Sequence, residues 1–410
     1  MALLIPFRAL RPTPASAARV AAVPYDVVNA EEAKALAAGN PLSFLHVSRA
    51  EIDLPADTNP YSDAVYARAA ENFTRLRGEA PLVVEEAPSL YVYRLRMGAH
   101  EQTGIAATFS VDEYDRDIIK KHERTRRDKE DDRTRHILEL RAQTGPVFLT
   151  HGASAGVDAV VRKTTGTAPL FDLTAADKVQ HTIWRVDSAD EQALVAAFAR
   201  IPALYIADGH HRAASAARVR QQLRGANGAA GEWDTFLAVA FPEDQMQVLP
   251  YNRVVKDLAT FTPDSLLAML REQFTVTEGP ATPVRRGDVA MFLGGRWYTI
   301  ALGDPSATAG GAALSAGDRL DVSRLQDAVL TPLLGIGDVR SDKRIDFVGG
   351  ARGTGELETL VTSGRFAVAF SMYPVSVRDL MEISDAGDIM PPKSTWFEPK
   401  LRDGMLSHLI

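Results

Sequence analysis

The sequence predicts a mixed α+β protein, because strand-like and helix-like segments alternate along its 410 residues. Residues 89–95 and 103–111 alternate large apolar and other side chains, which is typical of two strands paired across a turn at residues 97–99. Residues 64–76 and 191–201 instead carry apolar side chains at helical spacing. Because both patterns recur, we assign the chain to the α+β class.

The middle of the chain continues the alternation. Residues 203–207 form a short apolar run of buried-strand length, and the alanine-rich run 212–223 has strong helix propensity. The Gly- and Ala-rich residues 224–232 predict a surface loop. Residues 235–241 and 247–255 again predict strands.

The chain is two to three times as long as a typical domain, so we expect more than one domain. Thr262 and Pro263 predict the start of a helix, with Thr262 as the N-cap and the proline in the first turn. We therefore expect two domains, 1–260 and 261–410. The Gly-rich residues 303–317 predict a flexible excursion in the second of them.

Composition narrows the class of protein. The 46 Lys and Arg residues against 53 Asp and Glu give a net charge of −7, which argues against a protein that mainly binds nucleic acid. The absence of cysteine excludes disulfides, thiolate metal sites and a cysteine nucleophile, and it fits a reducing cytoplasm. The apolar start is too short for a signal peptide, and no run of about 18 apolar residues predicts a membrane span. A cytoplasmic globular protein is expected.

The most informative stretch is an Asp-Gly-His-His-Arg run between a buried-type strand and a helix. The first turn of a helix presents unpaired N–H groups and a partial positive charge, which attract phosphate. Gly209 allows close approach of the backbone to a ligand, and Arg212 can grip phosphate oxygens with forked hydrogen bonds. His210 and His211 add donors or an acid–base group near neutral pH. The alternative is an ordinary turn in which Asp208 caps the helix.

A second stretch follows the apolar pair Ile118–Ile119 and is densely charged. Residues 120–136 hold 8 Lys or Arg, 5 Asp or Glu and 2 His. Opposite charges three and four residues apart predict a solvated helix for most of these side chains. If the apolar pair ties the start of the segment to the core, Glu123 lies at the edge of a cleft, where it can act as a general base.

A third stretch, residues 388–400, lies near the C-terminus. Two prolines stiffen a loop that presents Lys393, Ser394 and Thr395 together, beside two aromatic residues. Three polar groups on a rigid loop suit an anionic or zwitterionic ligand. The alternative is a well-packed tail with aromatic anchors.

Three other patterns carry less weight. The His-Glu pair at 122–123 lacks the second histidine of a zincin, because Arg126 stands there, so a zinc site is disfavoured. The run 350–355 has the glycine spacing of a phosphate loop, but Glu356 replaces the required lysine, and we reject it. The Gly-x-Ser-x-Gly run around Ser154 fits a nucleophile elbow, although a small-residue turn between a strand and a helix is the preferred interpretation.

Together the three stretches resemble the free-serine kinases of the ParB/sulfiredoxin-like fold. In that group a Lys-x-His-Glu segment, an Asp-Gly-His-His-Arg phosphate motif and a Pro-Lys-Thr-Thr-type loop follow one another, as do residues 120–123, 208–212 and 392–395 here. The whole chain is still more similar to a bacterial family, domain-of-unknown-function family 1015, often labelled SpoOJ/ParB-like. Runs such as 23–28 and 341–350 carry that similarity.

The resemblance implies a ParB/sulfiredoxin-like nucleotide-binding core with an N-terminal extension, and a C-terminal α+β domain that contributes a substrate loop. It implies phosphoryl transfer from ADP or ATP to a small alcohol, with L-serine giving O-phosphoserine, or the same reaction in reverse. The partners are then a nucleotide and a small-molecule substrate. No membrane partner is expected, and the negative net charge disfavours nucleic acid as a partner.

The resemblance also implies roles for the candidate residues. Glu123 and His211 would be catalytic, with Glu123 taking the proton of the acceptor hydroxyl. The nucleotide-binding residues would be Asp208, Gly209, His210, His211 and Arg212, and Asp208 could also bind Mg²⁺. The acceptor would be positioned by Lys393, Ser394 and Thr395. Trp396 stands where those kinases tend to have an arginine, so the resemblance leaves recognition of a substrate carboxylate unassigned.

Two other classes of function stay open. A ParB-like nucleotide-dependent DNA-binding or regulatory protein would use the same phosphate motif as a switch, although no basic recognition helix is identified and the net charge is negative. A phosphatase or nucleotide hydrolase would use Glu123 to activate water. The sequence leaves the donor nucleotide, the acceptor, the direction of the reaction and the oligomeric state open.

Overall fold

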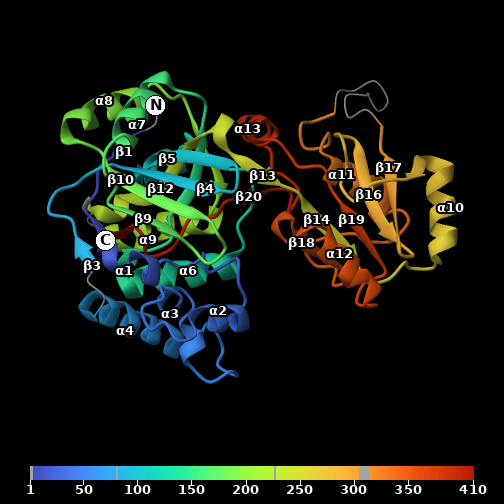
Figure 1. The fold of residues 1–410 in the computed structure, drawn as a ribbon, viewed down its shortest axis with the longest axis horizontal. Helices are drawn as coiled ribbons and strands as arrows, with labels where there is room; N and C mark the ends of the chain where they lie inside the picture. Colours follow the sequence, from blue (N-terminus) through green and yellow to red (C-terminus); the bar gives the residue numbers. More distant parts are fainter. Residues whose placement is uncertain (1–2, 80–81, 226–227, 304–313) are drawn as a thin grey trace. The chain divides into compact units, whose positions relative to one another are not determined.

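The computed structural model describes residues 3–79, 82–225, 228–303 and 314–410. Contacts within the chain divide it into two compact units: unit 1 is Met1–Met246 with Pro399–Ile410, and unit 2 is Gln247–Glu398. Both units combine helices with sheets, which confirms the predicted α+β class (Figure 1). The expected boundary at residue 260 lies inside unit 2.

Unit 1 is built on a nine-stranded mixed sheet in the order β6-β11-β8-β12-β5-β4-β10-β9, with β1 paired to β5. Most neighbours are antiparallel, but β6 runs parallel to β11 and β8 runs parallel to β12. The strands are β1 (Leu4–Ile5), β4 (Tyr91–Met97), β5 (His100–Ser110), β6 (Ile119–Lys120), β8 (Val147–His151), β9 (Phe171–Thr174), β10 (Gln180–Arg185), β11 (Leu204–Asp208) and β12 (Thr235–Pro242).

One face of this sheet is apolar and lies under helices. Alternate residues of the central strands, such as Ile105 and Phe109 of β5, are buried in one cluster with Val157 of α7, Phe198 of α8 and Ala213 of α9. Figure 1 shows α7 and α8 together beside the sheet. The helices of unit 1 are α1 (Pro14–Val20), α2 (Ala30–Ala37), α3 (Leu45–Ser48), α4 (Asp63–Glu79), α5 (Val111–Asp115), α6 (Arg127–Leu140), α7 (Ala155–Thr165), α8 (Ser188–Phe198) and α9 (His210–Arg224).

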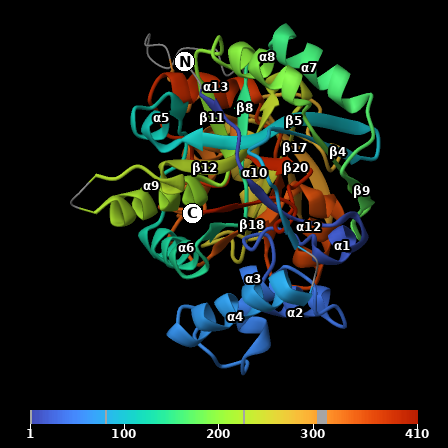
Figure 2. The same cartoon turned by 90° about the vertical axis from the view of Figure 1, so that its left-hand side faces the viewer.

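A second apolar cluster lies among α2, α3, α4 and α6, which Figure 2 shows grouped at one end of unit 1. Phe44 and Phe73 meet there edge to face, with ring centroids 6.3 Å apart. Next to it is a small four-stranded sheet in the order β3-β2-β21-β7. Its strands are β2 (Ala9–Pro12), β3 (Leu82–Val84), β7 (Ala142–Gln143) and β21 (Ser407–Leu409), so the last strand of the chain returns to unit 1.

Unit 2 contains an antiparallel six-stranded sheet in the order β15-β17-β16-β19-β14-β18, and a separate pair of strands, β13 and β20. Its strands are β13 (Gln247–Leu249), β14 (Tyr251–Val255), β15 (Thr275–Glu278), β16 (Asp288–Leu293), β17 (Arg296–Ala301), β18 (Ile345–Gly349), β19 (Val368–Ser371) and β20 (Trp396–Glu398). Its helices are α10 (Pro263–Gln273), α11 (Asp321–Leu325), α12 (Gly353–Thr362) and α13 (Val377–Asp385).

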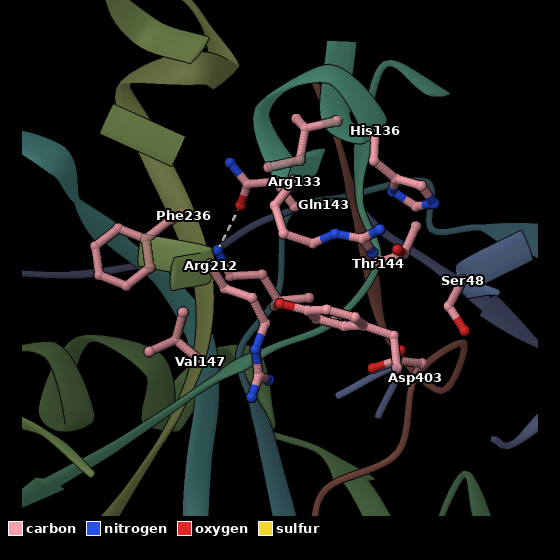
Figure 3. Close-up of a pocket in the computed structure, with 13 residues that line it drawn as sticks. Ser48, Arg133, His136, Gln143, Thr144, Val147, Arg212, Phe236 and Asp403 are labelled. Atoms are coloured by element: carbon pink, nitrogen blue, oxygen red, sulfur yellow. Dashed lines mark hydrogen bonds between the residues drawn. The ribbon is translucent and has the colours of Figure 1, made fainter. Parts of the chain in front are cut away.

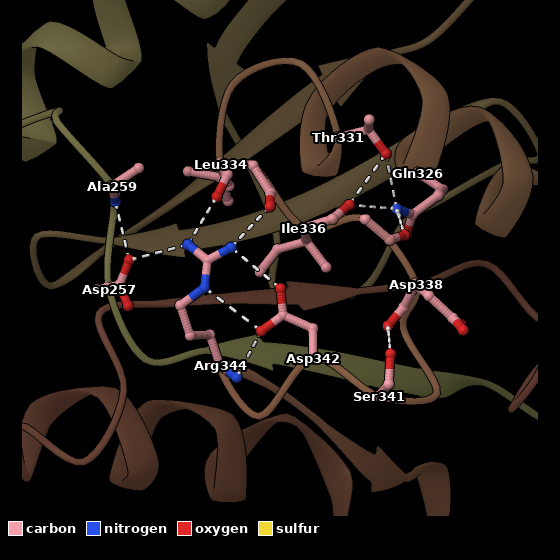
Figure 4. A network of polar contacts seen from close by, with 12 residues as sticks. Asp257, Ala259, Gln326, Thr331, Leu334, Ile336, Asp338, Ser341, Asp342 and Arg344 are labelled. Carbon is pink, nitrogen blue, oxygen red and sulfur yellow. Dashed lines mark hydrogen bonds and ion pairs between the residues drawn. The ribbon is translucent and has the colours of Figure 1, made fainter.

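A hydrogen-bonded network holds the loop before β18 (Figure 4). The guanidinium of Arg344 donates to the carbonyl oxygens of Leu334 and Gly335 at 3.0 and 2.7 Å, and to the carboxylate of Asp342 at 3.0 Å. Gln326 donates to the carbonyl oxygen of Ile336 at 2.8 Å. Asp342 and Arg344, which belong to the run 341–350 that carries the family similarity, therefore hold this loop in place.

Most predicted elements are present with shifted ends. Thr262 caps α10 as expected, since its Oγ1 accepts the N–H of Ser265 at 3.2 Å. The strand expected over 247–255 is instead two strands, β13 and β14, separated at Pro250, which has no N–H to donate to a ladder. Of the predicted loops, residues 226–227 and 304–313 lie outside the described part of the chain.

The helix expected across residues 120–136 is shorter at its start and more buried than predicted. Residues 119–120 are strand β6, and α6 begins only at Arg127. Asp132 and His136 of α6 are buried rather than solvated. The reason is tertiary: α6 packs between α4 and α9, so a charged segment also has an inward face.

A substitution at Gly104, in the middle of β5, tests how closely β5 packs in the large sheet. A Cβ atom there would lie 2.6 Å from the carbonyl oxygen of Ala240 and 2.8 Å from the ring of Phe241, both on β12. We expect Gly104→Ala to lower the free energy of unfolding by about 1–3 kcal/mol, measured by urea denaturation. Gly355→Ala in α12 is the control: its Cβ meets no described atom within 4 Å, and it should not destabilise. Equal stability of the two variants would contradict this account of the packing.

Candidate functional site

The parallel pairing of β6 with β11 brings two of the three candidate stretches together. Ile119 pairs with Leu204 and Lys120 with Tyr205, so the residues that follow the two strands emerge at the same edge of the sheet. Glu123 and Asp208 are each three residues beyond the Lys120–Tyr205 pair. The Oε2 atom of Glu123 lies 3.8 Å from Nδ1 of His210. The carboxylate thus faces the turn that leads into α9.

Gly209 forms that turn and precedes the first residue of α9. Its φ of 94° lies in the left-handed region that favours glycine. A Cβ atom would also lie 2.9 Å from Nε of Arg212. Glycine supplies no side-chain cap, so the first-turn N–H groups of this fifteen-residue helix suit an anion.

His210 is a buried, neutral imidazole. Its ring lies edge to face with that of His122, with centroids 4.4 Å apart, and its Nε2 accepts a long hydrogen bond of 3.5 Å from the N–H of His122. Burial, together with the neighbouring His122, holds the pKa of His210 well below its usual value. The proton of the neutral ring is therefore on Nδ1, the atom that faces Glu123.

His211 makes a similar contact one step further along. Its Nε2 accepts the N–H of Arg126 at 3.0 Å. Burial lowers the pKa of His211, which keeps this nitrogen available as an acceptor. Through these two contacts, His210 and His211 position the segment 122–126 that carries Glu123. The catalytic role expected for His211 stays a prediction.

A group of alternating charges lies behind the turn. The guanidinium of Arg212 donates to the carbonyl oxygen of Pro146 and lies 3.6 Å from Asp208 and 3.9 Å from Asp26. Lys400 donates to Asp208 at 3.0 Å. Burial alone would raise the pKa of Asp208, but the charges of Lys400 and Arg212 outweigh it and hold the pKa below its usual value. Two cations therefore flank the predicted phosphate turn.

The contacts of Asp208 affect how well its carboxylate could bind a magnesium ion. Asp208 already accepts from one cation and pairs with a second, and both would repel a divalent ion at its carboxylate. No group of three or more His, Asp or Glu in the described part of the chain is arranged to hold a metal ion. These contacts disfavour a further cation at the Asp208 carboxylate, and we derive no step through a metal. Magnesium binding by Asp208 stays a prediction.

Arg212 also lines a small cavity inside unit 1, of about 30 Å³. Figure 3 shows Arg133, His136, Arg212 and Asp403 around it. The guanidinium of Arg133 stacks 4.0 Å above the ring of Tyr25, which lines the same cavity. Burial raises the pKa of Asp403 to about 7 although Arg212 opposes the shift. A cavity of this size and polarity has room for about one or two ordered waters.

The candidate residues of the third stretch, 393–395, belong to unit 2. Lys393 has a φ of 57°, and its Nζ lies 5.3 Å from the centre of the Tyr251 ring. Ser394 is buried and donates to the carbonyl oxygen of Pro391 at 2.6 Å. Thr395 is half-buried. The expected substrate role of these three residues stays a prediction.

Sequence reasoning missed several members of the site. Lys400 ends the third stretch but was not singled out, because its partner Asp208 is 192 residues away. Asp26 lies in the run 23–28, which contributed only to the family similarity. Ser154 is an ordinary extended residue before α7, with φ of −142°, so the turn interpretation of its Gly-x-Ser-x-Gly run holds.

Comparisons with known proteins define the family. Residues 4–323 match the model described as "Protein of unknown function (DUF1015)", and the chain belongs to this family. No curated protein matches the chain. In the described residues, no helix has both the length and the apolar character that a membrane span requires.

The fold is distantly similar to several solved structures. A free serine kinase in complex with AMP is 14% identical, with a TM-score of 0.34 over 73% of this chain and 91% of that one. SbnI with a C-terminal truncation from Staphylococcus aureus is 12% identical, with a TM-score of 0.37 over 73% and 86%. A conserved hypothetical protein from Pyrococcus furiosus is 15% identical, with a TM-score of 0.34 over 75% and 95%.

The buried histidines make stability depend on pH. Burial lowers the pKa of His136 to about 4, while its Nε2 contacts the carbonyl oxygen of Val47 at 3.0 Å. The unfolded chain binds this proton near pH 6.5, so the stability contribution is complete above that pH and is lost as pH falls to about 4. His136→Gln keeps a donor and removes the titration. Its unfolding free energy should fall less over this window than that of the wild type, by up to about 3 kcal/mol in urea denaturation.

Asp403 acts in the opposite direction, because its raised pKa contributes stability that is lost as pH rises through about 7. Because His136→Gln and the wild type both contain Asp403, this contribution cancels when their free energies of unfolding are compared. The same pH dependence in both proteins would contradict a neutral buried His136.

Proposed function

We propose that the chain is a phosphotransferase that moves a phosphoryl group between ADP or ATP and a small alcohol, with L-serine and O-phosphoserine as acceptor and product. The reaction can run in either direction. The observation that carries the proposal is the carboxylate of Glu123, held 3.8 Å from His210 at the glycine turn before α9. A base and an anion-binding turn in contact are the two parts that such a transfer needs.

Glu123 is the proton acceptor in this proposal. The hydroxyl oxygen of the acceptor attacks the terminal phosphorus, the bond from that phosphorus to the bridging oxygen of the donor breaks, and the hydroxyl proton passes to Glu123. A positioned base of this kind contributes roughly 10²–10⁴-fold to the rate. The side chain is 48% exposed at the edge of unit 1, so an acceptor can reach it.

The turn and its two cations bind the donor phosphates. The first-turn N–H groups of α9 supply fixed donors, while Arg212 and Lys400 supply positive charge. Neutral His210 can donate from Nδ1 without adding a charge that would trap the product. This arrangement agrees with a ParB/sulfiredoxin-like nucleotide-binding core, which is the finer fold assignment that we propose for unit 1.

A nucleotide hydrolase is the second candidate. The same exposure of Glu123 that admits an alcohol also admits water, which the carboxylate could activate. The two activities differ in one product: the transferase forms O-phosphoserine only when serine is present, whereas the hydrolase releases inorganic phosphate without it.

Glu123→Gln tests the base. Purified protein is incubated with ATP or ADP, with and without L-serine, and O-phosphoserine and inorganic phosphate are quantified. We expect the variant to lose at least about 100-fold in turnover, because the amide cannot accept the proton, while nucleotide binding survives. Glu272→Gln on the exposed surface of unit 2 should behave like the wild type. Unchanged turnover in Glu123→Gln would overturn the assignment.

Lys400→Gln tests the phosphate subsite. Arg212 is only 8% exposed and pairs with two carboxylates, so its removal would also disturb folding. Loss of the Lys400 charge should weaken nucleotide binding by about tenfold in calorimetric titration, because one charge-assisted contact is lost. Lys163→Gln, at an exposed ion pair on α7, is the matched control. Equal affinity in both variants would remove Lys400 from the site.

A further inference from the structure

Unit 2 contains a buried arginine whose described surroundings hold no carboxylate. Arg253 of β14 is 4% exposed. Its guanidinium donates to the carbonyl oxygen of Tyr251 and lies 5.5 Å from the centre of the Phe347 ring. The other buried arginines among the described residues, Arg212 and Arg402, each contact an aspartate. Arg253 is therefore the exception in the part of the chain that the structure describes.

A buried cation without a counter-ion is costly. Burial lowers the pKa of Arg253 to about 9, so the guanidinium still carries its charge at neutral pH. One carbonyl oxygen uses one of its five donors. Unpaired buried charge destabilises a fold, and an anionic ligand at the guanidinium would supply the missing counter-charge.

The surroundings of Arg253 resemble a binding surface for a small anion. Arg253 pairs across the sheet with Phe347, and Tyr251 pairs with Gly349 on the same face. The ring of Trp396 lies 5.2 Å from that of Tyr251, centre to centre. A Cβ atom on Gly349 would come within 2.8 Å of the Trp396 ring. The Phe347 ring thus lies beside the guanidinium, the Tyr251 ring lies 6.1 Å from that of Phe347, and the Trp396 ring packs against Tyr251.

A second cation lies above this surface. The Nζ of Lys393 is 5.3 Å from the centre of the Tyr251 ring, on the exposed loop before β20. This cation–π contact holds the ammonium over the Tyr251 ring. A buried guanidinium beside aromatic rings suits a ligand with an acidic group on a small apolar body.

We propose that Arg253 binds the acidic group of a small-molecule ligand, a carboxylate or a phosphate, whose apolar part packs against Phe347, Tyr251 and Trp396, with Lys393 over the Tyr251 ring at the edge of the site. The site lies wholly within unit 2 and does not depend on phosphoryl transfer by Glu123.

The test compares melting temperatures of the full chain in sodium phosphate, sodium acetate and sodium chloride at equal ionic strength. In the wild type, phosphate or acetate should raise the melting temperature above its value in chloride, and the more effective anion identifies the acidic group. Arg253→Met should melt higher than the wild type in chloride, because an unpaired buried charge is gone, and should lose the part of the anion response due to this site.

Two further variants separate binding from structure. Arg253→Lys keeps the charge but loses the planar guanidinium that can donate two parallel hydrogen bonds to an anion. Its anion affinity, measured from the melting temperature at increasing anion concentration, should therefore be about tenfold weaker. Arg296→Met, at an exposed ion pair on β17 of the same sheet, should respond to anions as the wild type does.

Three results would overturn the proposal. They are no response to either anion in the wild type, an anion response of Arg253→Met equal to that of the wild type, or a lower melting temperature of Arg253→Met combined with an unchanged response of Arg253→Lys. The last would make Arg253 a structural residue. None of these results would affect the assay of Glu123, which reports on unit 1.

Discussion

The buried guanidinium of Arg212 is the charge on which the arrangement of unit 1 depends. It cannot leave the interior, so the chain supplies acceptors from distant segments: Pro146 before β8, Asp26 from the N-terminal region and Asp208 at the end of β11. Two glycines make room for it and its neighbours. A Cβ on Gly209 would strike its Nε, and one on Gly145 would lie 2.9 Å from Asp403.

The same charge explains why the C-terminal segment returns to unit 1. Lys400 pairs with Asp208, and Asp403 faces Arg212 across the small cavity. Acids and bases alternate around the turn, so the charges of Asp208 and Asp26 offset those of Arg212 and Lys400. A site assembled from both ends of the chain can form only in a completely folded unit 1, since neither end alone provides the partners.

His210 and His211 act in this site as uncharged hydrogen-bond acceptors. His210 and His211 each accept a backbone N–H from the segment 122–126, and burial keeps both rings uncharged. The proposed base, Glu123, is thereby positioned through groups that bring no charge of their own. Unit 2 differs in this respect, because Arg253 retains a charge that its described neighbours do not balance. One unit has a glycine turn flanked by compensated charges, and the other has a cation beside aromatic rings that no described carboxylate balances.

The sequence by itself determined the α+β class, most strands and helices, and the position of the Asp-Gly-His-His-Arg run between β11 and α9. These follow from local periodicity, glycine conformation and capping, which act within a few residues. Only the tertiary structure decided that Glu123 meets His210, that Lys400 meets Asp208 and that Arg253 has no acidic partner among the described residues. The first two contacts join residues 87 and 192 positions apart, and the third is a property of the whole neighbourhood. Strand pairing and burial decide such relations, and no local pattern records them.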